Sequence, residues 1–352
     1  MAGLRLPAHA PISDWKAITH PDRMAGDPVI LALSGGADDG AFGAGLLAGW
    51  TKRGDRPEFD IVTGVSAGAL IAPFAFLGAT YDDALADTFA RLDADTIAAP
   101  RGVLGLLDSS LFDTSPLRAL IGEIVDAPTI EAVAAEHRDG RRLFIVTTDL
   151  DRETAIVWNM GAIAATDDPR KISLFQDVLL ASSSIPGLFP PVEIGAVVSG
   201  RAFTELHIDG GASTEFLAVP EVFLRDAVWP HGSAEDARLF VVVNNRLSSR
   251  AEVVPARLSS IVERSLSTLI RSYERQSAER VLAFGRRTGV DTRIAAIEPA
   301  FQAPRDDWFD PAYMRAVYEH GVEVSLSRRA WHSLLEPLLR DTEPSIVDRS
   351  TR

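Results

Sequence analysis

The stretch Gly64-Val65-Ser66-Ala67-Gly68 decides the fold. The residues before it, Phe59 to Thr63, have the apolar and β-branched character of a strand, and Ala69 to Leu77 after it predict a buried helix. A G-x-S-x-G sequence between a strand and a helix is the nucleophile-elbow pattern, in which a tight turn exposes the serine hydroxyl. Because so short a pattern also arises by chance, its surroundings must support it.

A similar unit precedes this one. Val29 to Leu33 is a continuous apolar run, which is typical of a strand buried on both faces. The loop Ser34 to Gly40 follows it, and Ala41 to Trp50 predicts a helix rich in small residues. The alternation of strands and helices predicts an α/β fold with three layers, α/β/α, around a central, mostly parallel sheet.

The rest of the chain continues this pattern. We expect a hairpin from the strands 142–149 and 154–158, and further strands at 203–208, 239–243 and 292–297. Helices are expected at 82–92, from 115 and 128 onward, and at 172–181, 255–287, 311–321 and 325–339. Residues 28–340 are predicted to form one domain, between an irregular arm at 1–27 and a loose tail at 341–352.

Composition limits the possible functions. The chain has 352 residues, no cysteine and a net charge of −14, which argues against nucleic acid as a partner. No cysteine site is possible, no metal-ligand spacing is present, and no cofactor is implied. The sequence shows neither a signal peptide nor a transmembrane segment. We therefore expect a cytoplasmic protein, or one exported without a cleaved signal.

The loop Gly35-Gly36-Ala37 lies between a predicted strand and helix. Small residues there leave backbone N–H groups open toward the helix N-terminus, an arrangement that suits a phosphate or the oxyanion of an acyl-transfer intermediate. The P-loop pattern is missing, since no lysine follows Gly40, and the acids Asp38 and Asp39 disfavour a pyrophosphate. We interpret the loop as an oxyanion hole.

Asp209-Gly210-Gly211 ends a predicted strand. Enzymes of the α/β class place catalytic groups at the carboxyl ends of strands, but a D-G-G sequence is also an ordinary turn.

Taken together, these segments resemble the patatin-like phospholipases. That family has a Gly-rich loop after the first strand, a G-x-S-x-G elbow and a downstream D-G-G or D-G-A aspartate, and here residues 34–40, 64–68 and 209–211 follow in that order. The loop from Ala181 to Pro191 also resembles the family's segment between elbow and aspartate. The resemblance covers residues 28–215.

The resemblance implies a Ser-Asp dyad without a catalytic histidine. Ser66 would be the nucleophile and Asp209 the base, while the N–H groups of Gly35, Gly36 and Ala37 would hold the oxyanion. Partial burial would help an aspartate to act as a base near neutral pH. The supporting glycines of the motifs are Gly40, Gly64, Gly68, Gly210 and Gly211.

The loop departs from the family pattern G-G-G-x-[RK]-G at two positions. Ala37 replaces a glycine, and Asp39 stands where the family has a basic residue. An acid there makes a neutral lipid or a lysolipid a more suitable substrate than a charged headgroup. Asp38 and Asp39 are equally well placed to cap the helix that follows.

A histidine-dependent triad is the rival mechanism. His207 lies two residues before Asp209 on the same face of a strand, a spacing that rarely satisfies triad geometry. The remaining histidines lack acids at triad-like positions; they are His9, His20, His137, His231, His320 and His332.

The sequence thus predicts a serine lipid acyl hydrolase of the phospholipase A or lysophospholipase type, acting at a membrane or micelle surface. The alternatives are an acyltransferase that uses the same acyl-enzyme, and a lipid-binding protein with weakened catalysis. The segments Leu104 to Phe112 and Ile185 to Phe189 are candidates for lipid access, and either is equally compatible with a core position.

Overall fold

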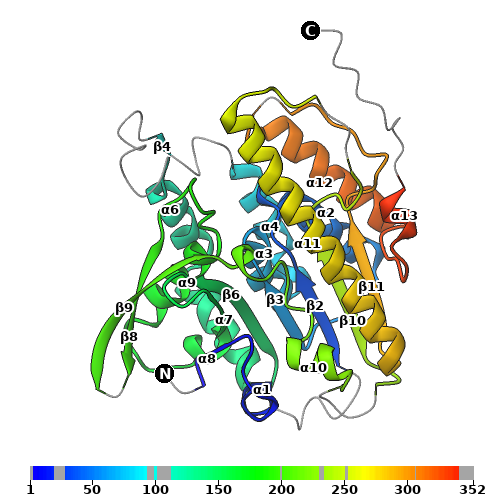
Figure 1. Ribbon diagram of the computed structural model, residues 1–352. Coiled ribbons are helices and arrows are strands. Elements are labelled where there is room, and N and C mark those ends of the chain that lie inside the picture. The colour runs from blue at the N-terminus through cyan, green and yellow to red at the C-terminus, as the bar shows by residue number, and fades with distance from the viewer. Residues whose placement is uncertain are drawn as a thin grey trace.

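The computed structural model describes residues 3–19, 28–92, 99–100, 112–198, 200–229, 234–249, 253–305 and 307–340. The predicted tail at 341–352 and most of the candidate access segment at 104–112 lie outside these ranges. Within them, one sheet of nine strands forms the centre of the molecule, as Figure 1 shows.

Five neighbouring strands of this sheet run parallel, in the order β6-β3-β2-β10-β11. Their bounds are β2 (Val29–Leu33), β3 (Ile61–Gly64), β6 (Arg142–Asp149), β10 (Arg238–Val243) and β11 (Asp291–Ala296). Four further strands join the sheet in antiparallel pairings. On one side of β6 lie β7 (Thr154–Asn159) and then β1 (Arg5–Pro7). On the other side, where β3 also pairs, the end of β6 pairs with β9 (Arg201–Asp209), which in turn pairs with β8 (Val192–Val198). The predicted mostly parallel sheet and its hairpin of β6 and β7 are confirmed.

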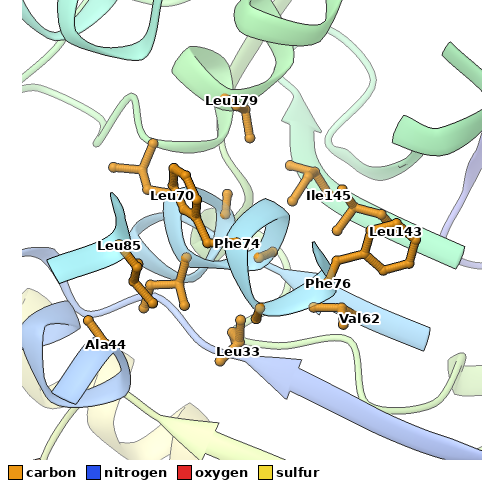
Figure 2. Packing of buried hydrophobic residues seen from close by; sticks show 14 of the residues in the cluster. Leu33, Ala44, Val62, Leu70, Phe74, Phe76, Leu85, Leu143, Ile145 and Leu179 are labelled. Atoms are coloured by element: carbon orange, nitrogen blue, oxygen red, sulfur yellow. The ribbon is translucent and has the colours of Figure 1, made fainter. Parts of the chain in front are cut away.

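Hydrophobic cores lie on both faces of the sheet. In β2, Leu31 and Leu33 belong to one core, whereas Ile30 and Ala32 belong to the other, because successive side chains of a strand point to opposite faces. This explains the uninterrupted apolar run of β2. Figure 2 shows part of the first core, in which Phe74 and Phe76 lie in one cluster with strand residues such as Leu33, Val62 and Leu143.

Helices cover each face and complete the three predicted layers. Residues buried in the first core come from α2 (Ala41–Arg53), α3 (Ala67–Leu77), α4 (Asp82–Arg91), α6 (Ser115–Ile124), α7 (Ala127–Arg138), α8 (Met160–Ala164), α9 (Lys171–Ser182) and α12 (Pro311–Leu326). The second core is covered by α1 (Ile12–Thr19), α10 (Glu221–Asp226), α11 (Leu258–Thr288) and α13 (Glu336–Leu339). In Figure 1, α11 crosses in front of the sheet.

The prediction of an irregular arm was wrong for residues 3–19. β1 pairs with β7 at the edge of the sheet, and α1 buries Trp15 and Ile18 in the second core. The strand is only three residues long and its pairing partner lies far along the chain, so local sequence gives little sign of it.

The helix expected at 325–339 was also wrong over most of its length. α12 continues to Leu326, and α13 covers only Glu336–Leu339. Between them, His332 forms a bridge with Ile294 beside β11, so the backbone there pairs with the sheet rather than coiling. No helix in the described part of the chain combines the length and the apolar character needed to cross a membrane.

Candidate active site

Ser66 lies on a sharp turn between β3 and α3. Its backbone has φ 54° and ψ −124°, a conformation that residues with side chains rarely adopt. A Cβ atom at Gly64 would lie 2.4 Å from the Gly68 carbonyl oxygen, and one at Gly68 would lie 2.5 Å from the Leu33 carbonyl oxygen. Both glycines of the elbow are therefore required by close backbone approach.

Ser182, the last residue of α9, holds this turn from the other side. Its hydroxyl accepts a hydrogen bond from the Ser66 N–H at 3.0 Å and donates one to the Val146 carbonyl at 2.7 Å. The strained serine is thus tied to β6. The sequence analysis missed Ser182, although it falls within the segment likened to the family's loop between elbow and aspartate.

Asp209, the last residue of β9, lies beside Ser66. The Ser66 hydroxyl donates a hydrogen bond to its carboxylate, and the Gly211 N–H donates another at 2.7 Å. Burial raises the pKa of Asp209 to about 7, against the lowering effect of these two hydrogen bonds. A Cβ at Gly210 would lie 2.4 Å from the Val146 carbonyl oxygen, so this glycine allows the turn to pass β6 closely.

The loop after β2 touches the elbow from the opposite side. A Cβ at Gly35 would lie 3.1 Å from the Cβ of Ser66, one at Gly36 would lie 2.0 Å from the Asn244 carbonyl oxygen, and one at Gly40 would lie 2.6 Å from the Cβ of Ala67. Side chains at Gly35 and Gly40 would push the loop away from the elbow, and one at Gly36 would push it away from Asn244.

Asn244, directly after β10, fixes this loop. Its backbone N–H donates to the Ser34 hydroxyl and its side-chain amide donates to the Ser34 carbonyl, both at 2.8 Å. Ala37 tolerates its side chain at a left-handed φ of 50°. The Gly35 N–H donates to the Glu215 carbonyl at 3.4 Å, which is long for a hydrogen bond.

Asp38 and Asp39 do not cap a helix. Neither forms a side-chain cap on the 3-10 turn η2 (Ala37–Gly40) or on α2. Asp38 pairs with Arg305 at 3.0 Å and accepts the Phe309 N–H at 3.3 Å. Asp39 accepts the Tyr313 hydroxyl at 2.5 Å, and burial raises its pKa. The two acids therefore anchor the segment that leads into α12.

An apolar pocket opens on Ser66. Apart from Ser66 and Ser183, its lining consists of Ala37, Ala67, Leu70, Phe89, Leu92, Leu117, Ile185, Phe189 and Phe309. Phe309 belongs to the segment that Asp38 anchors. Ile185 and Phe189, two residues of the predicted access segment, contribute to the wall.

The contacts of His207 are with residues outside the Ser66–Asp209 pair. Its Nδ1 lies 2.9 Å from the Thr147 hydroxyl and its Nε2 lies 3.4 Å from the Glu205 carboxylate, while its ring packs on Trp158. Burial lowers its pKa. These contacts give His207 a place in a buried polar network with Glu205, and they include neither Ser66 nor Asp209.

Two buried carboxyl groups near the site were missed by the sequence analysis. Burial together with the nearby Glu274 and Asp209 carboxyls raises the pKa of Glu215 to about 9. Burial is also the main cause that raises the pKa of Glu274 to about 8. Nothing in their local sequence marks them, because α11 and the segment after Asp209 meet only in the folded chain. Among the described residues, no cluster of three or more acidic, histidine or cysteine side chains is arranged to hold a metal ion.

Comparison with known protein families agrees with this architecture. The model of the patatin-like phospholipase family matches residues 31–220, which include the loop after β2, the elbow and Asp209. Among solved structures, that of VipD from Legionella pneumophila is 10% identical, with a TM-score of 0.39, and the match covers 87% of this chain and 67% of that one. A likeness of this degree supports no conclusion about residues or activity. A search of the curated proteins found no match.

The family match spans more than half of the chain, and the predicted resemblance is confirmed. The chain belongs to the patatin-like phospholipase family, whose general activity is lipid acyl hydrolysis.

Proposed function

We propose that the protein is a serine lipid acyl hydrolase of the phospholipase A or lysophospholipase type, with Ser66 and Asp209 as its catalytic dyad. The observation that carries this proposal is the hydrogen bond from the Ser66 hydroxyl to an Asp209 carboxylate whose pKa burial raises to about 7. A base with a pKa near the working pH combines a sufficient ionised fraction with an adequate affinity for the proton.

In the first half of the reaction, the Ser66 oxygen attacks the ester carbonyl carbon and its proton passes to Asp209. The tetrahedral intermediate then expels the alcohol or lysolipid, which takes the proton from Asp209, and the acyl chain remains on Ser66 as an ester. Water attacks this ester in the second half, again giving its proton to Asp209. The fatty acid leaves, and Ser66 regains its proton.

Backbone N–H groups of the loop after β2 would stabilise the oxyanion. We place Gly36 and Ala37 first, because the Gly35 N–H already donates to Glu215, while Gly35 itself lets the loop approach Ser66. Each well-placed donor contributes about 3–4 kcal/mol to transition-state stabilisation in comparable sites. The positive φ of Ala37 supports the view that alanine in place of glycine leaves the loop conformation intact.

The apolar pocket beside Ser66 suits the acyl chain of the substrate. Its wall offers phenylalanine and aliphatic side chains and no charged group, so it favours a hydrocarbon chain over a polar acyl group. Asp39 is engaged with Tyr313, and this contact supports the interpretation that it does not receive a headgroup. A neutral lipid or a lysolipid remains the substrate class that we favour.

Fatty-acid release tests this function. The purified protein would be incubated with phospholipid, lysophospholipid and neutral lipid in separate assays, beside the variants Ser66→Ala and Asp209→Asn. Release that both variants abolish supports the dyad, and the panel identifies the substrate class. Activity that survives in Ser66→Ala would refute the proposal, and transfer of the acyl chain to an added alcohol would identify an acyltransferase.

A further inference from the structure

The two halves of α11 meet different surroundings. In its C-terminal half, Ala278, Val281, Leu282 and Phe284 are buried in the second core, and the helix packs on β11. The N-terminal half exposes large apolar side chains, with 80% of Leu258 and 68% of Leu269 open to solvent. The full set is Leu258, Ile261, Val262, Leu266, Leu269, Ile270 and Tyr273. Since they recur at intervals of three and four residues, they share one face of the helix, which we call the α11 apolar face.

The opposite side of this half carries charged residues directed at the protein. Glu274 is buried, and Arg271 is sufficiently buried that its pKa is lowered. A surface helix normally turns its apolar side to the core and its charges to water. In the N-terminal half of α11 the apolar side faces water and the side with ionisable residues faces the protein. A contiguous exposed apolar patch of this kind marks an interaction surface.

The α11 apolar face ends beside the proposed active site. The Tyr273 hydroxyl donates to the Ser213 carbonyl at 3.4 Å, just after the Asp209-Gly210-Gly211 turn. Arg271 is near enough to Asp39 for its positive charge to oppose the rise in pKa that burial causes at that carboxyl. From Leu258 to Tyr273 the helix extends about 24 Å at 1.5 Å per residue, and Figure 1 shows this end of α11 at the top of the view.

We propose that the α11 apolar face docks the protein on a zwitterionic phospholipid surface. This inference rests on the proposed function, because a lipid surface is the partner that a lipid-accepting pocket next to the face requires. None of the side chains described on the face is charged, and the chain has a net charge of −14, so insertion of apolar groups rather than attraction to anionic lipid drives the docking. Binding is therefore expected to persist at high salt.

The test is flotation with phosphatidylcholine vesicles in the Ser66→Ala background, which keeps the vesicles intact. The triple variant Val262→Gln, Leu266→Gln and Leu269→Gln removes apolar area while glutamine retains helix propensity. We expect it to weaken vesicle binding by at least about tenfold. The matched control is Val197→Gln with Phe203→Gln, which changes exposed apolar side chains on the β8–β9 hairpin and should bind as the parent does.

A second assay separates this inference from the proposed function. With Ser66 intact, the triple variant should hydrolyse a water-soluble short-chain ester at the parent rate but lose hydrolysis of vesicle lipid. If the parent cleaves no ester yet binds vesicles through this face, the proposed function fails and the docking surface stands. The inference is overturned if the triple variant floats like the parent, or if the parent binds no vesicles and the same substitutions convert a dimer to a monomer in sedimentation equilibrium.

Discussion

The Asp209 carboxylate accepts the hydroxyl hydrogen of Ser66 because one strand, β6, pairs both with β3, which leads into the Ser66 turn, and with β9, which ends at Asp209. Gly64 of β3 lies opposite Ile145, and Asp209 of β9 lies opposite Thr147, two positions further along β6. The backbone register of the sheet thus brings the two side chains together. Substituting either side chain removes its chemistry and leaves this register in place.

Removal of the dyad should abolish turnover and preserve the fold. We expect Ser66→Ala to lower kcat by about 10³-fold or more, since no nucleophile remains. Asp209→Asn should lower kcat by about 10²–10⁴-fold, which is the usual contribution of a general base. The fold should persist, because the amide oxygen of asparagine can still accept the Gly211 N–H. Steady-state kinetics measure both effects, and unchanged circular dichroism is the control. Near-parent activity in Asp209→Asn would contradict the assignment of the base.

The pH dependence of kcat/KM should report the pKa of Asp209. The base works only when ionised, and burial raises its pKa to about 7. The rate constant is therefore expected to fall as pH drops through 7, approaching a tenfold loss for each further pH unit. A profile between pH 5 and 9 on a soluble ester checks this. A midpoint near 4, the ordinary aspartate value, would show that burial does not control the base.

Ser182 should act on the reaction by holding the elbow. Ser182→Ala leaves the buried Ser66 N–H and the Val146 carbonyl without this partner, at a cost of about 1–3 kcal/mol in folding stability. We expect kcat to fall more than KM rises, because the strained nucleophile loses its support. Ser184→Ala is the matched control, since among the described residues the hydroxyl of Ser184 donates a hydrogen bond only to the Leu180 carbonyl. Equal kinetics for the two variants would contradict the role of Ser182.

The sequence predicted those parts of the site that require glycine. In the elbow and in the loop after β2, atoms of other segments lie within about 3 Å of the place that a Cβ would occupy, and such a requirement leaves a readable pattern. Apolar runs such as Val29 to Leu33 likewise revealed the central strands, because both faces of β2 are buried. A position that requires glycine, or a strand that is buried on both faces, could thus be predicted.

Contacts made by folding could not be predicted in this way. Asn244 and Ser182 support the site through hydrogen bonds to distant segments, and asparagine or serine at such places has no distinctive spacing. Asp39 was interpreted from the family pattern and from its place before a helix, whereas its partner Tyr313 comes from α12. The exposed apolar face of α11 was also missed, because predicting a helix at 255–287 does not show which of its sides meets the rest of the protein.

The pocket should set the preferred length of the acyl chain. Leu117 of α6 contributes to its wall, so Leu117→Trp shortens the available space and Leu117→Ala extends it. We expect the first variant to lower kcat/KM for long-chain esters by at least about tenfold relative to short-chain esters, since each excluded methylene forfeits burial. Leu117→Ala should shift the preference toward longer acyl chains. Competition assays with esters of graded length measure this, and identical profiles would exclude the pocket as the acyl site.

The buried acids Glu215 and Glu274 should make stability fall as pH rises. Their pKa values in the folded protein are about 9 and about 8, against an ordinary value of 4.5, so the folded chain holds protons that the unfolded chain has released. Their contribution is complete below pH 4.5 and is lost as pH rises through 8 to 9. Glu274→Gln keeps the shape and removes the ionisation, so we expect its Tm to decline less than that of the parent between pH 6 and 9. Glu193→Gln, on the exposed side of β8, is the control and should follow the parent curve. Parallel curves for the parent and Glu274→Gln would mean that this carboxyl ionises in the folded protein as it does in water.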